Sequence, residues 1–340
     1  MPTTPLSTIN ERSNAEPNVN TGNAGTVNGP ILITGASGFA GSHLVQHLAR
    51  SHAVVGWARS TPPAEVASLA QWQPIDLLDG RAVTAAIHQL NPSAIFHCAG
   101  LPQVAESWRD TAAPLAANVV GTHRLLEAVR TLGSACRILV TGSAHVYAPS
   151  PAPIDEGHAL RPASPYAVSK LAQEQLALVA AAEDGLQVIV TRSFNHTGPR
   201  QQPSFVAPSI ARQIAAIERG DVEPVIRVGN LDAQRDLLDV RDAVRAYAVL
   251  IDAGIPGTVY NVASGVGRPV RAVLDALVAR ARVAIRVETD PERMRANDIP
   301  VLIGDPSRLR ETTGWQPEIP FDQTLDDLLA YWRQRGDGWG

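Results

Sequence analysis

Hydrophobic positions follow two alternating patterns along the first half of the chain. Five short runs rich in Val, Ile, Leu and Ala predict buried strands at Pro30–Thr34, Ala53–Ala58, Ala94–Cys98, Arg137–Thr141 and Gln187–Arg192. Between them, segments with apolar residues at helical spacing predict helices at Gly41–Arg50, Arg81–Leu90, Val119–Thr131 and Pro165–Ala182. Apolar strands that alternate with helices are typical of a parallel sheet covered on both faces. The predicted fold class is therefore α/β, a Rossmann-type doubly wound parallel sheet.

The pattern becomes irregular after about residue 193. Pro and Gly are frequent there, two predicted strands are isolated, and three helices are predicted. These later elements are the strands Val225–Val228 and Thr258–Val262 and the helices Val240–Asp252, Val270–Ala281 and Gln323–Arg333. We therefore divide the chain into a dinucleotide-binding domain at residues 30–193 and a mainly substrate-binding part at residues 194–335. The second part is predicted to be a smaller, irregular α/β unit at the carboxyl edge of the sheet, with some strands returning to the main sheet.

Composition and charge exclude several classes of protein. Of 340 residues, 45% are hydrophobic and 18% are charged, which is typical of a chain with a substantial core. The formal net charge of −4 indicates no nucleic-acid partner, although a few local arginines can still bind a small anion. The two cysteines, Cys98 and Cys136, form no CxxC or other metal-ligand spacing, so we predict neither a disulfide framework nor a metal site.

The apolar runs and the first residues bear on location. No run approaches the roughly 18 apolar residues that span a membrane, so we predict no membrane partner. The first 29 residues are rich in Asn, Thr, Pro and Gly and lack the apolar segment of a secretory signal. We expect residues 1–29 to form a disordered extension and the protein to be cytoplasmic.

A glycine-rich stretch, Thr-Gly-Ala-Ser-Gly-Phe-Ala-Gly at residues 34–41, directly follows the first predicted strand and opens a helix. Glycines at this spacing permit a tight turn, let the backbone approach a pyrophosphate and bring the helix close to the strand. The helix N-terminus then supplies free amide donors to phosphate oxygens. The spacing alone is weakly specific, but its strand–loop–helix context predicts a dinucleotide site. The predicted cofactor contacts here are Gly35, Ser37, Gly38, Phe39 and Ala40.

Residues beyond the second strand bear on which dinucleotide binds. An acidic residue there would hold an adenosine ribose hydroxyl, whereas Arg59 can hold a 2′-phosphate. Asp76 and Leu77, after the next short segment, are predicted to border the adenine. We therefore expect NADP(H) to be the preferred cofactor, with NAD(H) as the alternative.

Tyr166 and Lys170 form a Tyr-x-x-x-Lys pair that suits proton transfer. Pro165 is typical of the first turn of a helix, on which residues four apart share one side. Lys170 is the only lysine in the chain and the other 28 basic residues are arginines, so we infer that this position requires a compact ammonium. Free tyrosine has a pKa near ~10, and we expect the neighbouring ammonium to lower the pKa of Tyr166 toward neutrality. Tyr166 could then give a proton to a substrate oxygen as a hydride reaches the same carbonyl.

Ser143 is the candidate for a third polar group, one that orients the reacting oxygen. It lies in the run Thr-Gly-Ser-Ala-His at residues 141–145, at the carboxyl end of the fourth strand. The alternative is a serine that only stabilises the turn.

The glycine-rich loop, Ser143 and the tyrosine–lysine pair together resemble the extended short-chain dehydrogenase/reductases, over about residues 30–333. The resemblance implies that Ser143, Tyr166 and Lys170 are catalytic and that the lysine also binds the nicotinamide ribose. It further implies a cofactor-lining loop and a supporting asparagine, which match Ala99, Gly100 and Asn118.

Three motifs in the second half resemble the branch of this family that acts on GDP-sugars, which contains 4,6-dehydratases and 4-keto-6-deoxy-sugar reductases. They are Arg-Ser-Phe-Asn-His-Thr-Gly-Pro at residues 192–199, Val-Gly-Asn-Leu-Asp-Ala-Gln-Arg-Asp at 228–236 and Leu-Ile-Gly-Asp-Pro at 302–306. The implied substrate contacts are Asn195 and Arg235 with the diphosphate or sugar, Arg295 with a phosphate, Asp298 with the guanosine end, and also Val206. An arginine fork matches phosphate oxygens well. For Arg235 and Asp298 the alternative is an ordinary salt-bridged surface.

One departure from the dehydratase pattern bears on the reaction. Those enzymes carry a carboxylate two residues beyond the serine position to remove and return protons, whereas this chain has His145 there. The difference favours NAD(P)H-dependent reduction of a GDP-4-keto-6-deoxy-hexose to a GDP-6-deoxy-hexose such as GDP-D-rhamnose. A nucleotide-sugar 4-epimerase, a GDP-mannose 4,6-dehydratase that uses His145 and a non-catalytic dinucleotide sensor are the alternatives. His145 is itself either a substrate contact or a residue satisfied within its loop.

Two Ala-rich helices bear on assembly. The segments Ala112–Thr131 and Pro165–Ala182 resemble the dimer bundle of the family, so we predict a homodimer. Amphipathic helices of this kind also pack within one chain, which is the alternative.

Overall fold

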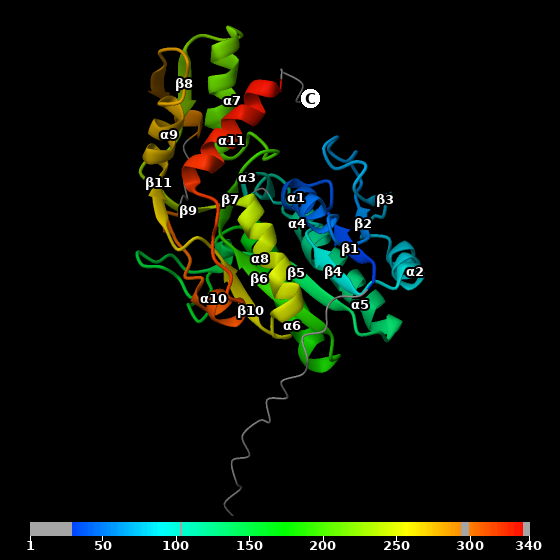
Figure 1. Cartoon of the computed structure of the whole chain (residues 1–340). Helices are drawn as coiled ribbons and strands as arrows, with labels where there is room; N and C mark the ends of the chain where they lie inside the picture. Colours follow the sequence, from blue (N-terminus) through cyan, green and yellow to red (C-terminus); the bar gives the residue numbers. More distant parts are fainter. Residues whose placement is uncertain (1–28, 103, 294–298, 336–340) are drawn as a thin grey trace, which may run out of the picture.

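The computed structural model describes residues 29–102, 104–293 and 299–335. Its centre is a seven-stranded sheet whose neighbouring strands all run parallel (Figure 1). Across the sheet the strand order is β10 (Val259–Val262), β6 (Gln187–Ser193), β5 (Arg137–Ser143), β4 (Ala94–His97), β1 (Ile31–Thr34), β2 (Val54–Trp57) and β3 (Gln71–Gln73). The chain builds outward from β1 to β3 and then restarts at β4 on the other side of β1. The predicted doubly wound parallel sheet is confirmed, and sheets of this kind bind ligands at such a reversal.

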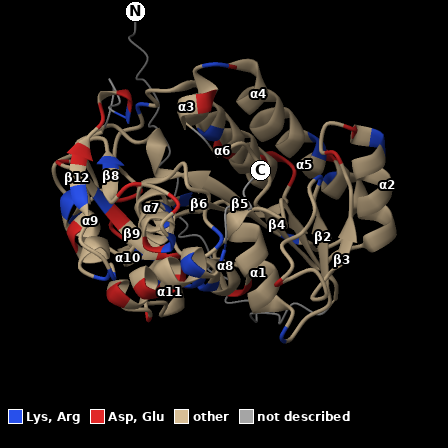
Figure 2. Ribbon diagram, turned by 90° about the horizontal axis from the view of Figure 1, so that it is seen from above, with Lys and Arg blue, Asp and Glu red and all other residues tan. Residues whose placement is uncertain are grey.

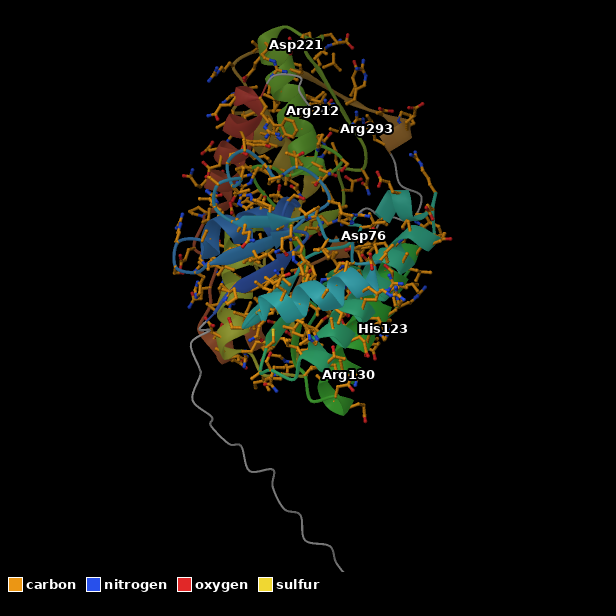
Figure 3. All side chains as sticks on the ribbon, turned by 90° about the vertical axis from the view of Figure 1, so that its right-hand side faces the viewer. Asp76, His123, Arg130, Arg212, Asp221 and Arg293 are labelled. Atoms are coloured by element: carbon orange, nitrogen blue, oxygen red, sulfur yellow. The ribbon has the colours of Figure 1, made fainter. Side chains whose placement is uncertain are left out.

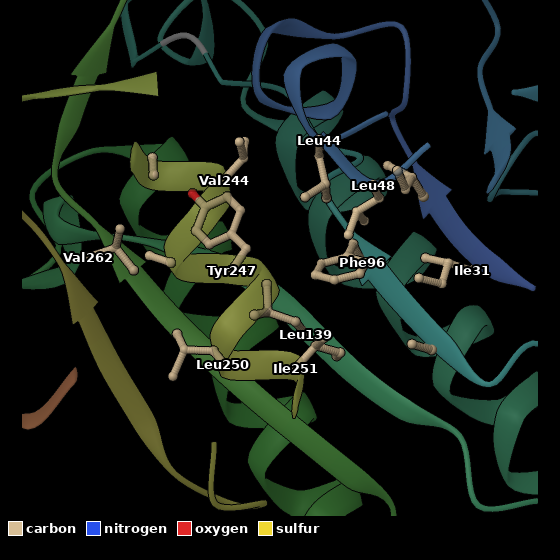
Figure 4. Packing of buried hydrophobic residues seen from close by; sticks show 14 of the residues in the cluster. Ile31, Leu44, Leu48, Phe96, Leu139, Val244, Tyr247, Leu250, Ile251 and Val262 are labelled. Carbon is tan, nitrogen blue, oxygen red and sulfur yellow. The ribbon is translucent and has the colours of Figure 1, made fainter. Parts of the chain in front are cut away.

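Helices cover both faces of this sheet because its strands are apolar on both sides. One face carries α1 (Phe39–Leu48) and α8 (Val240–Ala253), and the other carries α2 (Gly80–Leu90), α5 (Gly121–Leu132) and α6 (Pro165–Glu183). Figure 4 shows the first face, where Phe96 lies beside Leu44 and Leu48 of α1 and shares its cluster with Tyr247 of α8. Successive strand residues point to opposite faces, so Ile31 joins this cluster whereas Leu32 packs on the opposite face.

A second core lies in the C-terminal part of the chain, in the upper part of Figure 1. Three amphipathic helices share it, namely α7 (Val206–Arg219), α9 (Val270–Val278) and α11 (Phe321–Gln334). They pack beside two small sheets, one formed by β7 (Asn195–Thr197), β9 (Gln234–Asp239), β11 (Gly267–Pro269) and β13 (Val301–Leu302), the other by β8 (Val225–Val228) and β12 (Arg286–Thr289). The short elements are α3 (Val104–Ser107), α4 (Ala112–Pro114), the π-helix η1 (Leu115–Val120), the 3₁₀ turns η2 (Ala144–Val146) and η3 (Pro291–Arg293), and α10 (Ser307–Thr313).

Some elements differ from the sequence-based prediction. Helix α7 was not predicted, because Pro208 interrupts its pattern. The proline lies in the first helical turn, where its missing N–H breaks no helical hydrogen bond. Strand β10 was predicted as an isolated strand but joins the main sheet beside β6, in line with the expectation that some strands of the C-terminal part return to that sheet. The division near residue 193 and the disorder of residues 1–29 stay predictions, and all but Gly29 of that extension lies outside the described residues.

Charged residues of both signs are interspersed along α9, α11, β8 and β12 (Figure 2). Several pair with one another, as Arg280 does with Asp322 at 2.8 Å and Arg333 with Glu218 at 2.7 Å. The charges of these two arginines, one just beyond α9 and one on α11, are therefore partly neutralised. Within the described residues, no helix combines the length and the apolar character needed to cross a bilayer.

Candidate active site

The carboxyl ends of β1, β4 and β5 bring the predicted cofactor loop and catalytic residues to one edge of the main sheet. Strand β1 ends at Thr34, and Gly35 then adopts a φ of +66°, which favours glycine. A Cβ at Gly35 would lie 2.7 Å from the backbone of Ala99, the residue that follows Cys98 at the end of β4. A Cβ at Gly41 would collide with the Gly35 carbonyl oxygen. Two glycines are therefore required sterically for this turn to close.

Helix α1 begins beside this turn with its backbone amides directed out of the helix end. Gly38 is the N-cap and contributes no side-chain hydrogen bond, so the amides of Phe39 and Ala40 meet no capping side chain from it. Ser37 lies in the same turn, where its hydroxyl is 2.7 Å from that of Ser60. A phosphate fits such a cradle because uncapped amides and the helix dipole both favour negative charge.

Arg59 and Asp76 lie at the ends of neighbouring strands, β2 and β3. Their closest atoms, Nη1 and Oδ2, are 3.9 Å apart, and the side chains are 68% and 49% exposed. An exposed ion pair of this kind is weak, so Arg59 can exchange Asp76 for a phosphate. Leu77 packs toward α5, where a Cβ at Gly121 would lie 3.2 Å from it. Ser60 was not predicted as part of the cofactor site, although it directly follows Arg59 in the sequence.

The catalytic candidates Ser143, Tyr166 and Lys170 lie together and are all buried. Helix α6 begins at Pro165, and the Ser164 hydroxyl caps it by accepting the Ala167 amide at 3.1 Å. Tyr166 and Lys170 therefore lie one turn apart near the start of α6. The Tyr166 hydroxyl and the Ser143 side chain are hydrogen-bonded, which joins the end of β5 to the helix.

Lys170 is held from behind by two acceptors. Its Nζ donates to the Thr141 carbonyl oxygen at 2.8 Å and to Gln173 Oε1 at 2.9 Å. An ammonium has three hydrogens, so one further hydrogen can serve a ligand. A Cβ at Gly100 would lie 3.6 Å from Nζ and 2.5 Å from Asn118 Oδ1, which places the predicted cofactor-lining loop beside the ammonium. Burial lowers the pKa of Lys170 to about 8.

The pKa of Tyr166 moves in the opposite direction from the prediction. Burial raises it, and the hydrogen bond with Ser143 offsets this only in part. The predicted lowering by Lys170 is wrong for the protein's own groups, because the ammonium directs hydrogens to Thr141 and Gln173 while desolvation acts on the phenol. At neutral pH, Tyr166 is therefore a protonated acid.

His145 lies within this catalytic group. Its ring meets the Tyr166 ring edge to face, with centroids 6.1 Å apart and an interplanar angle of 76°. Its backbone amide donates to Ser143 Oγ at 3.3 Å. The imidazole is thus placed beside the phenol, at the position where the dehydratase pattern has a carboxylate.

The predicted substrate residues lie on elements of the C-terminal part. Strand β7 places Asn195 next to His196, whose ring stacks on Phe39 of the cofactor loop with centroids 5.6 Å apart. The Asn195 Oδ1 atom is buried and has no hydrogen-bond partner within the described residues. Arg235 on β9 donates to the Ile299 carbonyl oxygen at 2.7 Å.

The remaining predicted contacts are less closely placed. Val206 is the exposed first residue of α7. Arg295 and Asp298 lie outside the described residues.

Two residues of the site, Gln173 and His196, were not predicted from the sequence. Gln173 lies three residues after Lys170 on the same face of α6, and His196 directly follows Asn195. Their spacing from predicted site residues could have identified both.

A family model described as GDP-mannose 4,6 dehydratase matches residues 32–328. The chain belongs to this family. The predicted resemblance to extended short-chain dehydrogenase/reductases is thereby confirmed, and the chain is an NAD(P)-dependent enzyme of that type.

Similar proteins match nearly the whole length of the chain. GDP-6-deoxy-D-mannose reductase of Pseudomonas aeruginosa is 39% identical over 308 residues, 90% of this chain and 97% of that protein. UDP-glucose 4-epimerase of Mycolicibacterium smegmatis is 31% identical over 316 residues, 89% of this chain and 98% of that protein. The solved structure of RMD from Pseudomonas aeruginosa complexed with NADPH is 36% identical, with a TM-score of 0.80, and covers 91% of this chain and 100% of that chain.

Proposed function

We propose that the protein reduces the C4 keto group of a GDP-4-keto-6-deoxy-hexose with NADPH and forms a GDP-6-deoxy-hexose such as GDP-D-rhamnose. The similarity to GDP-6-deoxy-D-mannose reductase, which extends over 90% of this chain, is the observation that carries the proposal. The assembled group of Ser143, Tyr166 and Lys170 supports it, because reduction of a carbonyl needs a positioned proton donor.

The cofactor site is proposed to extend along the sheet edge. Gly35, Ser37, Gly38, Phe39 and Ala40 would hold the pyrophosphate. Arg59 would hold a 2′-phosphate, with Asp76 and Leu77 near the adenine, and Ala99, Gly100 and Lys170 would line the nicotinamide end. The exposure of Arg59 and the NADPH bound to the P. aeruginosa structure support NADP(H) as the preferred dinucleotide.

The chemistry follows from the protonation states of the site. When bound, the reduced nicotinamide supplies the hydride for the carbonyl carbon. Tyr166 is protonated at neutral pH and can transfer its proton to the carbonyl oxygen, so that C=O becomes CH–OH. The Ser143 hydroxyl can donate to the same oxygen, and the Lys170 ammonium stabilises the negative charge left on the phenolate.

His145 favours reduction over dehydration. Loss of water from a hexose requires a group that removes a proton from carbon and returns one. A carboxylate does this in the dehydratase pattern, whereas the side chain beside Tyr166 here is an imidazole. We propose that His145 contacts the substrate instead.

The substrate contacts are proposed from the C-terminal part. The unpartnered Asn195 Oδ1 is an acceptor, so it suits a sugar hydroxyl better than a phosphate oxygen. Arg235 would contact the diphosphate or sugar, and Val206, Arg295 and Asp298 the remaining GDP.

A spectrophotometric assay tests this proposal. The purified protein is offered GDP-4-keto-6-deoxymannose with NADPH, and loss of the reduced-nicotinamide absorbance is followed. Absence of oxidation would contradict the reductase proposal. In parallel, conversion of GDP-mannose with oxidised cofactor would indicate a dehydratase, and turnover of a nucleotide sugar without added cofactor would indicate an epimerase.

A homodimer is also proposed. Four large apolar side chains are exposed on η1 and α6, and they are Leu115, Val120, Val168 and Val179. Figure 3 views the neighbouring α5 from its outer side, where His123 and Arg130 are labelled. Exposed apolar residues on adjacent helices are typical of a surface that associates. Cytoplasmic location and the absence of nucleic-acid partners stay predictions.

A further inference from the structure

A chain of buried polar side chains lies behind Lys170. Thr34 on β1, His97 on β4, Thr122 on α5 and Gln173 on α6 are all fully buried, and each contacts the next. The distances are 2.7 Å from Thr34 Oγ1 to His97 Nδ1, 2.8 Å from His97 Nε2 to Thr122 Oγ1 and 2.8 Å from Gln173 Nε2 to Thr122 Oγ1. Burial of a polar group lowers the stability of the fold unless the group is hydrogen-bonded. Each donor in this row, which joins four elements, must therefore meet an acceptor.

The donor and the acceptor of every hydrogen bond in this row of side chains follow from the groups at its two ends. The Lys170 ammonium can only donate, so Gln173 must turn its oxygen to Lys170 and its amide nitrogen to Thr122. The Asn118 backbone carbonyl oxygen can only accept, so the Thr122 hydroxyl donates its single hydrogen to it, with 2.6 Å between the two oxygens. Thr122 Oγ1 is therefore an acceptor toward both Gln173 and His97.

This assignment fixes the tautomer of His97. Its Nε2 must carry the hydrogen that Thr122 accepts, and its Nδ1 must accept from the Thr34 hydroxyl. Thr34 Oγ1 in turn accepts the Ala99 amide at 3.3 Å. Burial lowers the pKa of His97 to about 3, so the ring is neutral and keeps one donor and one acceptor nitrogen.

We propose that His97, Thr122 and Gln173 are positioning residues for Lys170. They hold the Gln173 oxygen against the ammonium and exclude the flipped amide, whose NH₂ would face the positive charge. Together with the Thr141 carbonyl, this oxygen directs the remaining hydrogen of Lys170 toward the site. The inference rests on the proposed function only in that Lys170 takes part in catalysis.

The acceptor oxygen of Gln173 stabilises the charged form of Lys170. The hydrogen-bonded side chains that orient this oxygen therefore influence the pH at which the ammonium loses its proton. The titratable groups that face Lys170 are uncharged near pH 8. Burial raises the pKa of Cys98 on the loop after β4 to about 12 and also raises that of Tyr166, while His97 stays neutral. The partners contributed by η1, α5 and β5 do not titrate, namely Asn118, Thr122 and Thr141. Loss of the Gln173 oxygen is therefore expected to change the titration of Lys170 directly.

The chain composition makes this measurable without an activity assay. Lys170 is the only lysine, so lysine-selective ¹³C labelling of the full chain yields a single lysine Cε signal. Its pH titration is expected to have a midpoint near pH 8 in the unsubstituted protein. Gln173→Met removes the acceptor at similar volume and is expected to lower this midpoint by about one pH unit, roughly a tenfold change in the protonation equilibrium.

Two Thr122 variants separate positioning from mere packing. Thr122→Val removes the hydroxyl that orients Gln173 and is expected to lower the Lys170 midpoint, whereas Thr122→Ser keeps the hydroxyl and should leave it unchanged. Midpoints equal to that of the unsubstituted protein in both Gln173→Met and Thr122→Val would overturn the inference.

A further measurement needs no substitution in the chain. In the unsubstituted protein, ¹⁵N shifts of the His97 ring are expected to show a protonated Nε2 and an unprotonated Nδ1, without titration between pH 6 and 8. The reverse tautomer would overturn the inference even where a variant fails to fold. Conversely, the expected NMR results in a protein that reduces no GDP-sugar would contradict only the proposed function.

Discussion

Burial influences the protonation of Tyr166 and Lys170 as much as their hydrogen bonds do. Tyr166 and Lys170 are one helical turn apart, and both are held in a protein interior that disfavours charge. Burial keeps the phenol protonated, as a proton donor must be, and brings the ammonium close to its neutral form. In the proposed reaction, Tyr166 would release one proton, and the Lys170 ammonium one helical turn away would favour the resulting phenolate.

Lys170→Arg tests whether this position needs a compact ammonium. The guanidinium keeps the charge but cannot fit between the Thr141 carbonyl and Gln173 in the same way, so turnover is expected to fall by roughly 10²-fold or more. The Lys170 ammonium is charged below its pKa of about 8, so activity of the unsubstituted enzyme should decline as pH rises through that value. The variant stays charged and should lack this decline. Initial rates from pH 6 to pH 10 would check both points, and full activity in the variant would contradict them.

Arg59→Ala tests the cofactor preference. Removing the guanidinium takes away the group proposed for the 2′-phosphate, so KM for NADPH should rise about tenfold while KM for NADH changes little. Steady-state kinetics with each dinucleotide measure the effect. Asp76→Asn is the matched control, since it removes the Arg59 ion pair without removing the cation. Equal changes for both dinucleotides in Arg59→Ala would contradict a role in phosphate recognition.

Some of these residues could be predicted from sequence and others could not. Lys170 stood out because no other lysine exists in the chain, and Ser143 because it ends an apolar strand. Thr122 and His97 carried no such signal, since their roles depend on β4, α5 and α6 meeting at hydrogen-bond distance. The pKa of Tyr166 was predicted in the wrong direction because a one-dimensional pattern does not reveal how deeply the phenol is buried.

At the level of elements, the turn between β1 and α1 is the proposed binding site for the dinucleotide pyrophosphate. Its backbone closes only because two positions lack side chains, Gly35 against Ala99 and Gly41 against the Gly35 carbonyl. The strands beside it end at the same edge, so short loops from β4 and β5 complete the site.

Gly41→Ala tests this close approach of helix and turn. The added methyl group would overlap the Gly35 carbonyl oxygen, so the turn must open and NADPH should bind at least roughly tenfold more weakly. Fluorescence titration with NADPH measures the affinity. Gly157→Ala is the control, because its Cβ would meet only Asp155 Oδ1 at an ordinary 3.4 Å. Similar NADPH affinities in the two variants would contradict the steric account.

The elements that sequence patterns predicted are the long or fully apolar ones. Strands β1, β4, β5 and β6 are short apolar runs between amphipathic helices, and such runs are recognisable. Strand β3 reads Gln-Trp-Gln and β13 has two residues, so neither presents a periodic pattern. The π-helix η1 lies within the segment predicted as one regular helix, and π-helices are too rare to be predicted from apolar spacing.

At the scale of the whole molecule, η1 and α6 carry four of the large apolar side chains that are exposed within the described residues. Val168 and Val179 are eleven residues apart on α6, three helical turns, so both lie on one side of the helix. Leu115 and Val120 on η1 are exposed as well, and η1 packs beside α6. In the proposed homodimer, these side chains lie in the interface with the second copy of the chain.

Val179→Glu tests this surface. A carboxylate buried in a dimer interface without a partner is costly, so the variant should shift the protein toward monomer at micromolar concentration. Sedimentation velocity measures the change. Val222→Glu is the matched control, because Val222 is exposed to a similar extent, 53% against 56%, but lies in the C-terminal part between α7 and β8. A dimer unchanged in Val179→Glu would contradict this interface.

The most direct test of the central claim follows the hydride itself. NADPH carrying deuterium at the transferable position of C4 is incubated with the enzyme and GDP-4-keto-6-deoxymannose, and the sugar product is analysed by mass spectrometry and NMR. Reduction at C4 of the sugar predicts one deuterium on that carbon of a GDP-6-deoxy-hexose, one NADPH consumed per product, and loss of both in Tyr166→Phe. A product without deuterium at C4, or an unchanged NADPH pool alongside an epimerised sugar, would contradict it.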